Sequence, residues 1–406
     1  MLLLLLAFAI GVAIGCVAGL LPSVHPNNTI PLVLAAASFF DPLSAAVILI
    51  TAGIVNSFVA FVPSILIGAP DDAEALSVLP GHRMLLQGQG IEAIRLTALG
   101  GLGAIALGIL LLPLLAIVIP PVYTAIRPHT HWLLAAAVIF LLFCEPNAKK
   151  MASSVLIFGL AGVLGFVVLD VFVLENGLLP LLSGLFGAPT LIVALKEKLN
   201  LPESLNNEKP KEKTKLMPGI ATGAAAGILA GLLPGIGSSQ AAMLVQGKDN
   251  SEKGMRKFLV ALGGVSAADV LYSLFALWLI GNARSGIAVA IGQLIKVGVK
   301  EIAIFSIVGI TAAVIGFWLT MGLAKVALKW LRRVNYQKLC ASVLIMITSL
   351  VAIMSGVPGL VVFCAATGIG LLGGKLGVRR SWAMGCLIVP TMLYFAGFID
   401  LISSNQ

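Results

Sequence analysis

Long apolar runs, separated by short polar stretches, extend along almost the whole chain, from Met1 to Ile402. Well-defined examples lie near 92–119, 152–174 and 177–195. A helix needs about 20 apolar residues to cross a hydrocarbon core about 30 Å thick, and these runs are of that order of length. We therefore predict an all-α polytopic membrane protein with roughly 10–14 membrane segments, some of them broken helices or re-entrant hairpins.

The composition also indicates that the chain lies in a lipid bilayer. Only 11% of the 406 residues are charged and 59% are hydrophobic, whereas soluble domains carry about 25% charged residues. The 44 glycines and 20 prolines, many of them inside apolar runs, predict broken or closely packed helices. The five cysteines lie far apart, without a CxxC or Cys/His cluster. We therefore expect no metal site, and no cofactor beyond a coupling ion, Na⁺ or H⁺.

An internal repeat is the strongest pattern in the sequence. The segment Gly15–His25 (GCVAGLLPSVH) aligns with Gly227–Gly237 (GILAGLLPGIG), half a chain further on. Each copy continues through a polar tip, Pro26–Thr29 in the first and Ser238–Gln240 in the second, before the sequence becomes apolar again. The pattern predicts two helical hairpins whose polar tips lie within the membrane.

The repeat divides the chain into a first membrane half, 1–195, a charged linker, 196–217, and a second membrane half, 218–406. The lysines of the linker favour the cytoplasmic side of the plasma membrane, because basic loops are retained there. Counting apolar runs outward from the linker then places both termini outside.

The charges also predict that the two halves have opposite orientations. The basic segment Lys325–Lys338 and the weakly charged segment Pro120–His131 occupy corresponding places in the two halves. Counting crossings puts Lys325–Lys338 inside, with Lys149/Lys150 and Lys375–Arg380, but puts Pro120–His131 outside. This arrangement is typical of inverted-topology repeats. A tandem duplication without inversion stays open.

The two tips are candidate binding elements because Pro22 and Pro234 end apolar helices inside the predicted membrane. Such breaks free backbone amides and carbonyls, which a cavity or a ligand must satisfy where water is absent. Helix N-termini suit a carboxylate or a phosphate. The substrate-binding residues expected in the tips are Pro22, Ser23, His25, Asn27, Asn28, Thr29, Pro234, Gly235, Gly237, Ser238, Ser239 and Gln240. A hairpin that serves packing alone is the alternative.

Polar residues within apolar runs are further candidates because burial of a charge is costly. Asp269 follows Ser266 by three positions and aligns near Asn56 and Ser57 of the first half. We expect Asp269 and Ser266 to bind the coupling ion, and Asn56 and Ser57 to line the substrate site. Arg284 is the cation expected to bind a carboxylate through two guanidinium nitrogens. A helix-end role for Asp269 and a surface position for Arg284 are the alternatives.

The stretch Gly68–Ala93 is unusually polar and rich in turns, and it includes Pro80-Gly81 and Gln87-Gly88. Together with Asn176–Gly187 and the repeated Gly-Leu-Leu-Pro tips, it resembles the large permease subunit of the tripartite tricarboxylate transporters, the TctA-type family. The resemblance covers most of both halves. It implies an ion-driven permease for carboxylates, whose partners are a small membrane subunit and an extracytoplasmic binding protein.

The chain departs from that family pattern at two turns. Pro70-Asp71-Asp72 stands where the family has Pro-Gly-Thr, and Asn282-Ala283-Arg284 stands where a second Pro-Gly turn is expected. The chain is also shorter than typical bacterial members. These departures indicate a divergent branch, in which the binding protein could be absent.

The sequence favours a secondary transporter that moves a small organic anion, a carboxylate, by alternating access coupled to an ion gradient. A carrier for an anionic lipid such as a polyprenyl phosphate is the alternative, since groups that bind a carboxylate also bind a phosphate. No G-x-x-x-x-G-K-[ST], HExxH or G-x-S-x-G motif occurs, which argues against an ATP-driven pump and against an enzyme. The expected surroundings are the bilayer and, as an open question, a second copy of the chain, but no nucleic acid.

Single cysteines introduced at Thr124 and Gln337 test the inverted arrangement. We expect a membrane-impermeant maleimide to label them from opposite sides of the membrane, because the two segments correspond in the repeat but lie on different faces. Labelling of both from one side would establish a tandem duplication instead.

Overall fold

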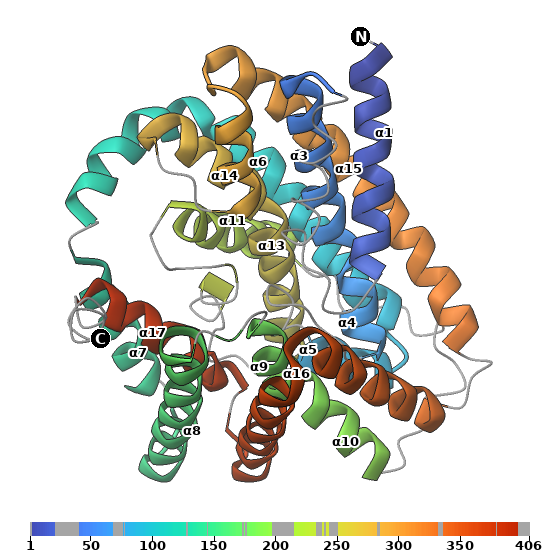
Figure 1. The fold of residues 1–406 in the computed structure, drawn as a ribbon, viewed down its shortest axis with the longest axis vertical. Helices are drawn as coiled ribbons and strands as arrows, with labels where there is room; N and C mark the ends of the chain where they lie inside the picture. Colours follow the sequence, from blue (N-terminus) through green and yellow to red (C-terminus); the bar gives the residue numbers. More distant parts are fainter. Residues whose placement is uncertain are drawn as a thin grey trace.

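The computed structural model of this protein is helical throughout the part of the chain that it describes, without a strand there (Figure 1). The described residues are 2–20, 40–67, 76, 78–126, 129–143, 145–172, 174, 177–196, 215–232, 238, 241–242, 251–281, 285–331, 336–378 and 380–396.

The helices of the first half are α1 (Leu2–Leu20), α3 (Pro42–Val59), α4 (Phe61–Ile67), α5 (Val78–Leu86), α6 (Gly90–Ile126), α7 (Thr130–Phe143), α8 (Ala148–Phe166), α9 (Leu178–Leu182) and α10 (Ala188–Lys196), with π-helical turns η5 (Val167–Val171) and η6 (Ser183–Gly187). Those of the second half are α11 (Leu216–Leu232), α13 (Glu252–Ile280), α14 (Gly286–Leu294), α15 (Val299–Leu331), α16 (Tyr336–Leu376) and α17 (Gly385–Phe395), with the 3₁₀ turn η7 (Arg380–Met384).

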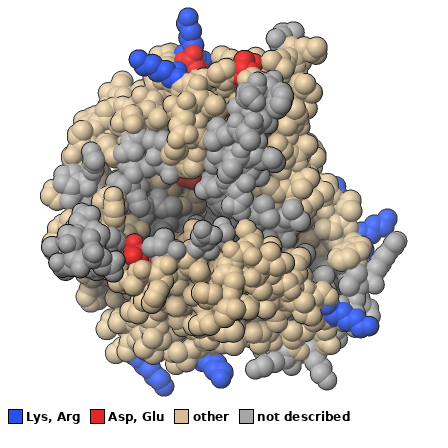
Figure 2. Space-filling model, in the orientation of Figure 1, with Lys and Arg blue, Asp and Glu red and all other residues tan. Residues whose placement is uncertain are grey.

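The protein is an all-α polytopic membrane protein. Seven helices in the described residues are long and apolar enough to cross a bilayer. In Figure 2, the Lys and Arg side chains lie at the top, at the bottom and at the right-hand edge of the molecule, and most of the described surface between them carries no charge. These observations confirm the fold class predicted from the sequence, while the number of crossings and the sidedness of the linker and termini stay predictions.

Side-chain caps define where several helices begin. Asp41 caps α3 and accepts hydrogen bonds from the Ser44 backbone nitrogen, at 3.1 Å, and from Ser44 Oγ, at 2.7 Å. These bonds hold the pKa of Asp41 below its usual value, since they favour the carboxylate. Ser251 caps α13 in the same way, at 3.2 Å from the Gly254 nitrogen. Gly281, at φ +65°, ends α13 in a left-handed conformation that glycine adopts without strain.

A stripe of glycines fastens α1 to α3. Gly11, Gly15 and Gly19 are four residues apart and therefore lie on one face of α1. A Cβ placed on Gly15 would lie 2.5 Å from the carbonyl oxygen of Ala52, so only glycine allows this approach. Gly11 meets Ile48 and Thr51, and Gly19 meets Asn56 and Val59. Because the contacts advance together along both helices, α1 and α3 are parallel.

The second half repeats this packing. The corresponding glycines of α11, Gly223, Gly227 and Gly231, contact α13, and a Cβ on Gly223 would lie 2.5 Å from the Ala261 carbonyl oxygen. Gly231 meets Tyr272 and Ser273 further along α13, so α11 and α13 are also parallel. The alignment found in the sequence therefore holds at the level of helix packing.

The two halves cross at α3 and α13, which run antiparallel. A Cβ on Gly53 of α3 would lie 3.3 Å from a methyl group of Val270 on α13. Further along α3, Phe58 lies at the level of Ala267. A Cβ on Gly101 of α6 would lie 3.0 Å from Phe58 Cζ and 2.8 Å from Ala267 Cβ. The residue numbers thus rise along α3 while they fall along α13.

The next long helix of each half, α6 in the first and α15 in the second, packs against the other half. Along α6, Thr97 meets Gly263 and Gly108 meets Tyr272, so α6 runs parallel to α13. Along α15, Gly309 meets Ile54 and Gly316 meets Phe58, so α15 runs parallel to α3. Corresponding helices of the two halves therefore point in opposite directions, as inverted repeats would require. Inversion relative to the membrane stays a prediction.

Among the remaining helices, elements of the first half again pack against elements of the second. Gly165 of α8 packs against Cys386 of α17, and Gly184 of η6 packs against Phe363 of α16. The long helix α16 is broken at Gly356, whose φ of 62° and ψ of −160° suit glycine alone, just before Pro358. A broken helix within an apolar span is what the glycine and proline content predicted.

Gly100→Ala should destabilise the fold strongly, because its Cβ would overlap the carbonyl oxygen of Val260 on α13. Gly159→Ala is the matched control, since nothing lies within 4 Å of its Cβ, and removal of a helix glycine stabilises by about 0.5–1 kcal/mol. Thermal unfolding in detergent measures both. Equal unfolding temperatures for the two variants would contradict the close contact of α6 with α13.

Candidate functional site

The crossing of α3 and α13 brings together polar residues from both halves. Asn56 and Ser57 on α3 are 4% and 8% exposed, and Ser266 on α13 is 3% exposed. Because the antiparallel helices meet at Gly53 and Val270, Asn56 and Ser266 both lie one turn from the crossing, on the same side of it. The structure thus places four sequence-predicted residues, Asn56, Ser57, Ser266 and the partly buried Asp269, around one contact between the halves.

Three buried polar atoms on the two crossing helices have no hydrogen-bond partner among the described residues. Thr51 Oγ1 lies where α3 contacts Gly11 of α1, and the other two are Asn56 Nδ2 and Ser273 Oγ, with Ser273 0% exposed. Ser57, in contrast, donates from Oγ to the Gly53 carbonyl oxygen at 2.9 Å, within its own helix. A buried polar atom without a partner costs about 1–3 kcal/mol. Asn56 and Ser273 are therefore positions where a further group is expected.

The main chain of each of these two residues lies beside the first helix of its own half. A Cβ on Gly19, one residue before the end of α1, would lie 3.1 Å from the Asn56 carbonyl oxygen. A Cβ on Gly231, one residue before the end of α11, would lie 3.2 Å from the Ser273 backbone nitrogen. Each half thus has a residue with an unpartnered buried polar atom whose main chain lies beside the helix that leads into its predicted tip.

The chemistry of these groups suits an anion or a polar neutral molecule. The Asn56 amide nitrogen is only a donor, and a serine hydroxyl donates as well as accepts. The groups are uncharged, so they can bind carboxylate oxygens without the cost of a buried cation. Ser266 and Asp269 add oxygen atoms that can coordinate Na⁺, and the Asp269 carboxylate can also bind a proton.

Most of the tip residues lie outside the described part of the chain. These are Pro22, Ser23, His25, Asn27, Asn28, Thr29, Pro234, Gly235, Gly237, Ser239 and Gln240, and Arg284 lies outside it as well. Ser238 is described and is partly buried, close in sequence to Ala241 and Ala242, which are 0% exposed.

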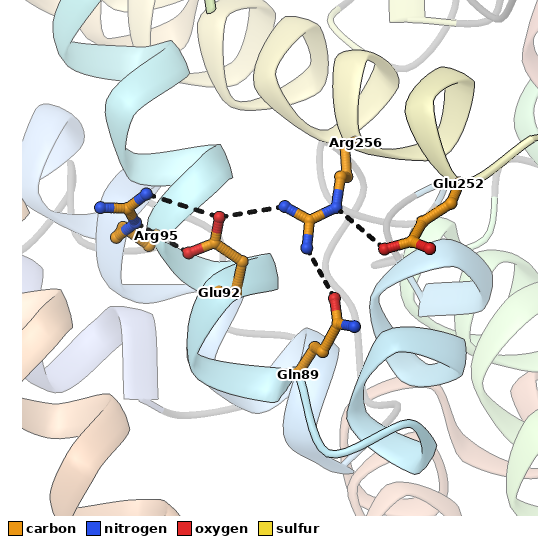
Figure 3. Close-up of polar contacts among 5 residues, drawn as sticks. All are labelled: Gln89, Glu92, Arg95, Glu252 and Arg256. Carbon is orange, nitrogen blue, oxygen red and sulfur yellow. Dashed lines mark hydrogen bonds and ion pairs between the residues drawn. The ribbon is translucent and has the colours of Figure 1, made fainter. Parts of the chain in front are cut away.

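A charged network between α6 and α13 was not found from the sequence (Figure 3). Arg256 is 2% exposed, and its guanidinium contacts Glu92 at 3.1 Å, Glu252 at 3.3 Å and Gln89 at 2.7 Å. Arg95 extends the network to the surface through an ion pair with Glu92 at 2.8 Å. The four-residue spacing of Glu252 and Arg256 was a usable signal, but nothing local connects Arg256 with Glu92.

Comparisons with known proteins agree over nearly the whole chain. A family model described as the tripartite tricarboxylate transporter TctA family matches residues 5–385. An uncharacterized protein of Methanocaldococcus jannaschii is 31% identical over 402 residues, which cover 96% of this chain and 98% of that protein. No solved structure matches the chain.

Asn56→Leu should raise the unfolding temperature of the protein without ligand, because it removes a buried amide that lacks a partner among the described residues. Ser57→Ala should lower it or leave it unchanged, since Ser57 Oγ is already bonded. Differential scanning fluorimetry in detergent, without added anions, gives both values. A lower unfolding temperature for Asn56→Leu would mean that a residue of the chain already binds the amide.

Proposed function

We propose, from the premise that this chain belongs to the tripartite tricarboxylate transporter TctA family, that it moves a small carboxylate across the membrane as a secondary transporter. The family is one of transporters rather than of enzymes, and the apolar helices fit that role. We further propose alternating access coupled to an ion gradient as the mechanism.

The observation that carries this proposal is a pair of buried polar atoms, one in each half, on the two helices that cross. Asn56 Nδ2 and Ser273 Oγ lack partners in the described part of the chain, and the main chain of each residue lies beside a helix that leads to a predicted tip. The two residues lie on opposite sides of the crossing, so they would bind separate oxygen atoms of the substrate. Free backbone amides of Gly235 and Gly237 would complete its coordination, because glycine allows close approach of the main chain.

The coupling ion would bind on the α13 side of the same crossing. A carboxylate substrate brings negative charge into a site whose described donors are neutral, so a cation that binds with it reduces the cost of burial. Asp269 and Ser266 supply the oxygen atoms that Na⁺ prefers, and Asp269 would serve equally as a proton carrier. Arg284 would pair with a second carboxylate of the substrate.

The opposite directions of α3 and α13 support our proposal that the halves are inverted repeats. In such proteins the site lies at the interface of the repeats, and one repeat rocks against the other to expose it on alternate sides. In this protein the halves meet at the crossing near Gly53 and Val270 and along the contacts of α6 with α13 and of α3 with α15. The proposed site and the proposed mechanism therefore both depend on the interface between the halves.

The family assignment also bears on substrate and partners. It favours a carboxylate over a polyprenyl phosphate as the anion, and a tripartite system implies a small membrane subunit and a binding protein. We propose that this chain supplies the permeation path, with such subunits delivering substrate to its outer face.

The test is thermal stabilisation of the purified protein by citrate, with and without Na⁺, against undecaprenyl phosphate as the lipid probe. We expect citrate to raise the unfolding temperature more in Na⁺, because a bound ligand stabilises the folded state. The double variant Gly237→Val/Asn28→Ala should lose the shift, and Asp269→Asn should lose its Na⁺ dependence. Thr222→Ala is the matched control, because within the described residues Thr222 Oγ1 bonds only to carbonyls of α11 itself, at 2.8 and 3.0 Å.

A shift with undecaprenyl phosphate but none with citrate, malate or succinate would replace the carboxylate with a lipid. A citrate shift that survives the double variant in a well-folded sample would remove the tips from the site.

A further inference from the structure

The network of Arg256 lies where two parallel helices begin side by side. The N-terminal ends of α6 and α13 each carry partial positive charge, and each has an acidic residue in its first turn, Glu92 and Glu252. Arg256 lies between the two carboxylates and also donates a hydrogen bond to the Gln89 amide oxygen (Figure 3). The network thus joins a helix of the first half to a helix of the second.

This contact resists sliding for two independent reasons. A Cβ on Gly100 would overlap the Val260 carbonyl oxygen, and a Cβ on Gly263 would overlap the Thr97 carbonyl oxygen, so the two backbones touch. A shift by even one turn would bring larger residues into the contact. Separation would remove from Arg256, which is 2% exposed, its bonds to Glu92 and Gln89 and leave it with Glu252 of its own helix, and loss of a partner in a buried ion pair is strongly destabilising.

The counterpart of this contact in the repeat is the pair α3 and α15, and it is built differently. Both helices again start with an acid, but Asp41 accepts from Ser44 at 2.7 Å and Glu301 accepts from the Gly298 nitrogen at 2.9 Å. Each acid is therefore satisfied within its own helix start. Among the described residues, no ion pair joins α3 to α15.

The packing of α3 with α15 is also looser. A Cβ on Gly309 would lie 3.5 Å from Ile54 Cδ1, and one on Gly316 would lie 3.2 Å from Phe58 Cγ. These are contacts with side-chain atoms, which can change rotamer, rather than with main-chain carbonyls. The two equivalent contacts of the repeat thus differ in stiffness.

We propose that Arg256 clamps α6 and α13 into one rigid body, and that the conformational change of transport occurs instead at the contact of α3 with α15. The clamp makes Arg256 a positioning residue, because it fixes the helix that carries Ser266, Asp269 and Ser273. The transport part of this inference rests on the proposed function, whereas the difference in rigidity does not.

Distances between spin labels test the rigidity directly, in the full chain with its five native cysteines replaced, in lipid nanodiscs. One label pair, Leu110→Cys/Lys257→Cys, reports on α6 and α13. The other, Val17→Cys/Val326→Cys, reports on α15 against α1, which the glycine stripe fastens to α3. We expect a narrow distance distribution for the first pair and a broader or bimodal one for the second. A distribution for the first pair as broad as that for the second would overturn the proposal.

Two variants of the network separate the clamp from general loss of stability. Arg256→Met should broaden the distribution of the α6/α13 pair. Arg95→Met should not, because Arg95 forms hydrogen bonds only with Glu92 among the described residues and is half-exposed. Equal narrow distributions in wild type and Arg256→Met would show that the glycine contacts suffice without the arginine. If Arg256→Met does not fold, the comparison of the two wild-type pairs still decides the question.

Two matched disulfides connect rigidity with transport. Ala104→Cys/Gly264→Cys joins α6 to α13, and Phe58→Cys/Gly316→Cys joins α15 to α3, with Cβ separations of 3.2 and 3.3 Å. Both approach the range that a disulfide bridges, about 3.5–4.5 Å. We expect Na⁺-driven uptake of radiolabelled citrate into proteoliposomes to survive the first disulfide and to be lost with the second, until a reductant restores it.

Loss of uptake with both disulfides, or with neither, would overturn the assignment of the moving contact. If the reduced proteins also fail to take up citrate, the proposed function fails for citrate, while the spin-label distances still decide whether Arg256 is a clamp.

Discussion

Close approach of helix backbones is the constraint on which this structure depends. Inside a bilayer, burial of apolar side chains gives little drive for helices to associate, because lipid tails are equally apolar. Association then rests on dispersion contacts, which require surfaces without protruding side chains. The glycine stripes of α1 and α11 provide such surfaces, and Gly100 and Gly263 provide another between α6 and α13. The network of Arg256 lies beside the contact of α6 with α13.

This dependence explains why so much of the fold could be predicted from sequence. Glycines at four-residue spacing are visible in the printed chain, and Gly15 and Gly227 appear in equal surroundings. The partner of each stripe is the next long helix, so local order identified it. The packing of α6 and α15 against helices of the other half could not be predicted in this way. Arg256 and Glu92 are separated by 164 positions, and no periodicity relates two such residues.

The candidate site was predictable to the extent that polar residues stand out in apolar runs. Asn56 and Asp269 were identified for that reason, and the structure brings their helices together. Ser273 was missed because a serine within a membrane helix usually bonds a carbonyl of its own helix, as Ser57 and Ser306 do. Only the three-dimensional structure shows that Ser273 Oγ lacks such a bond in the described part of the chain.

The positions of the buried ion pairs and of the neutral hydrogen-bonding groups match what a carrier requires. A contact that persists through the transport cycle can contain a buried ion pair. The free-energy cost of removing its charges from water is incurred once, on folding, because the geometry does not change afterwards. A site that must bind and release an anion gains from neutral donors, since each cycle then need not strip and restore the hydration of a buried cation. The described donors at the crossing of α3 and α13 are accordingly amide and hydroxyl groups, whose bonds have a modest net free energy in exchange with water. The network of Arg256 lies instead where α6 and α13 begin, and there it joins two helices that already touch.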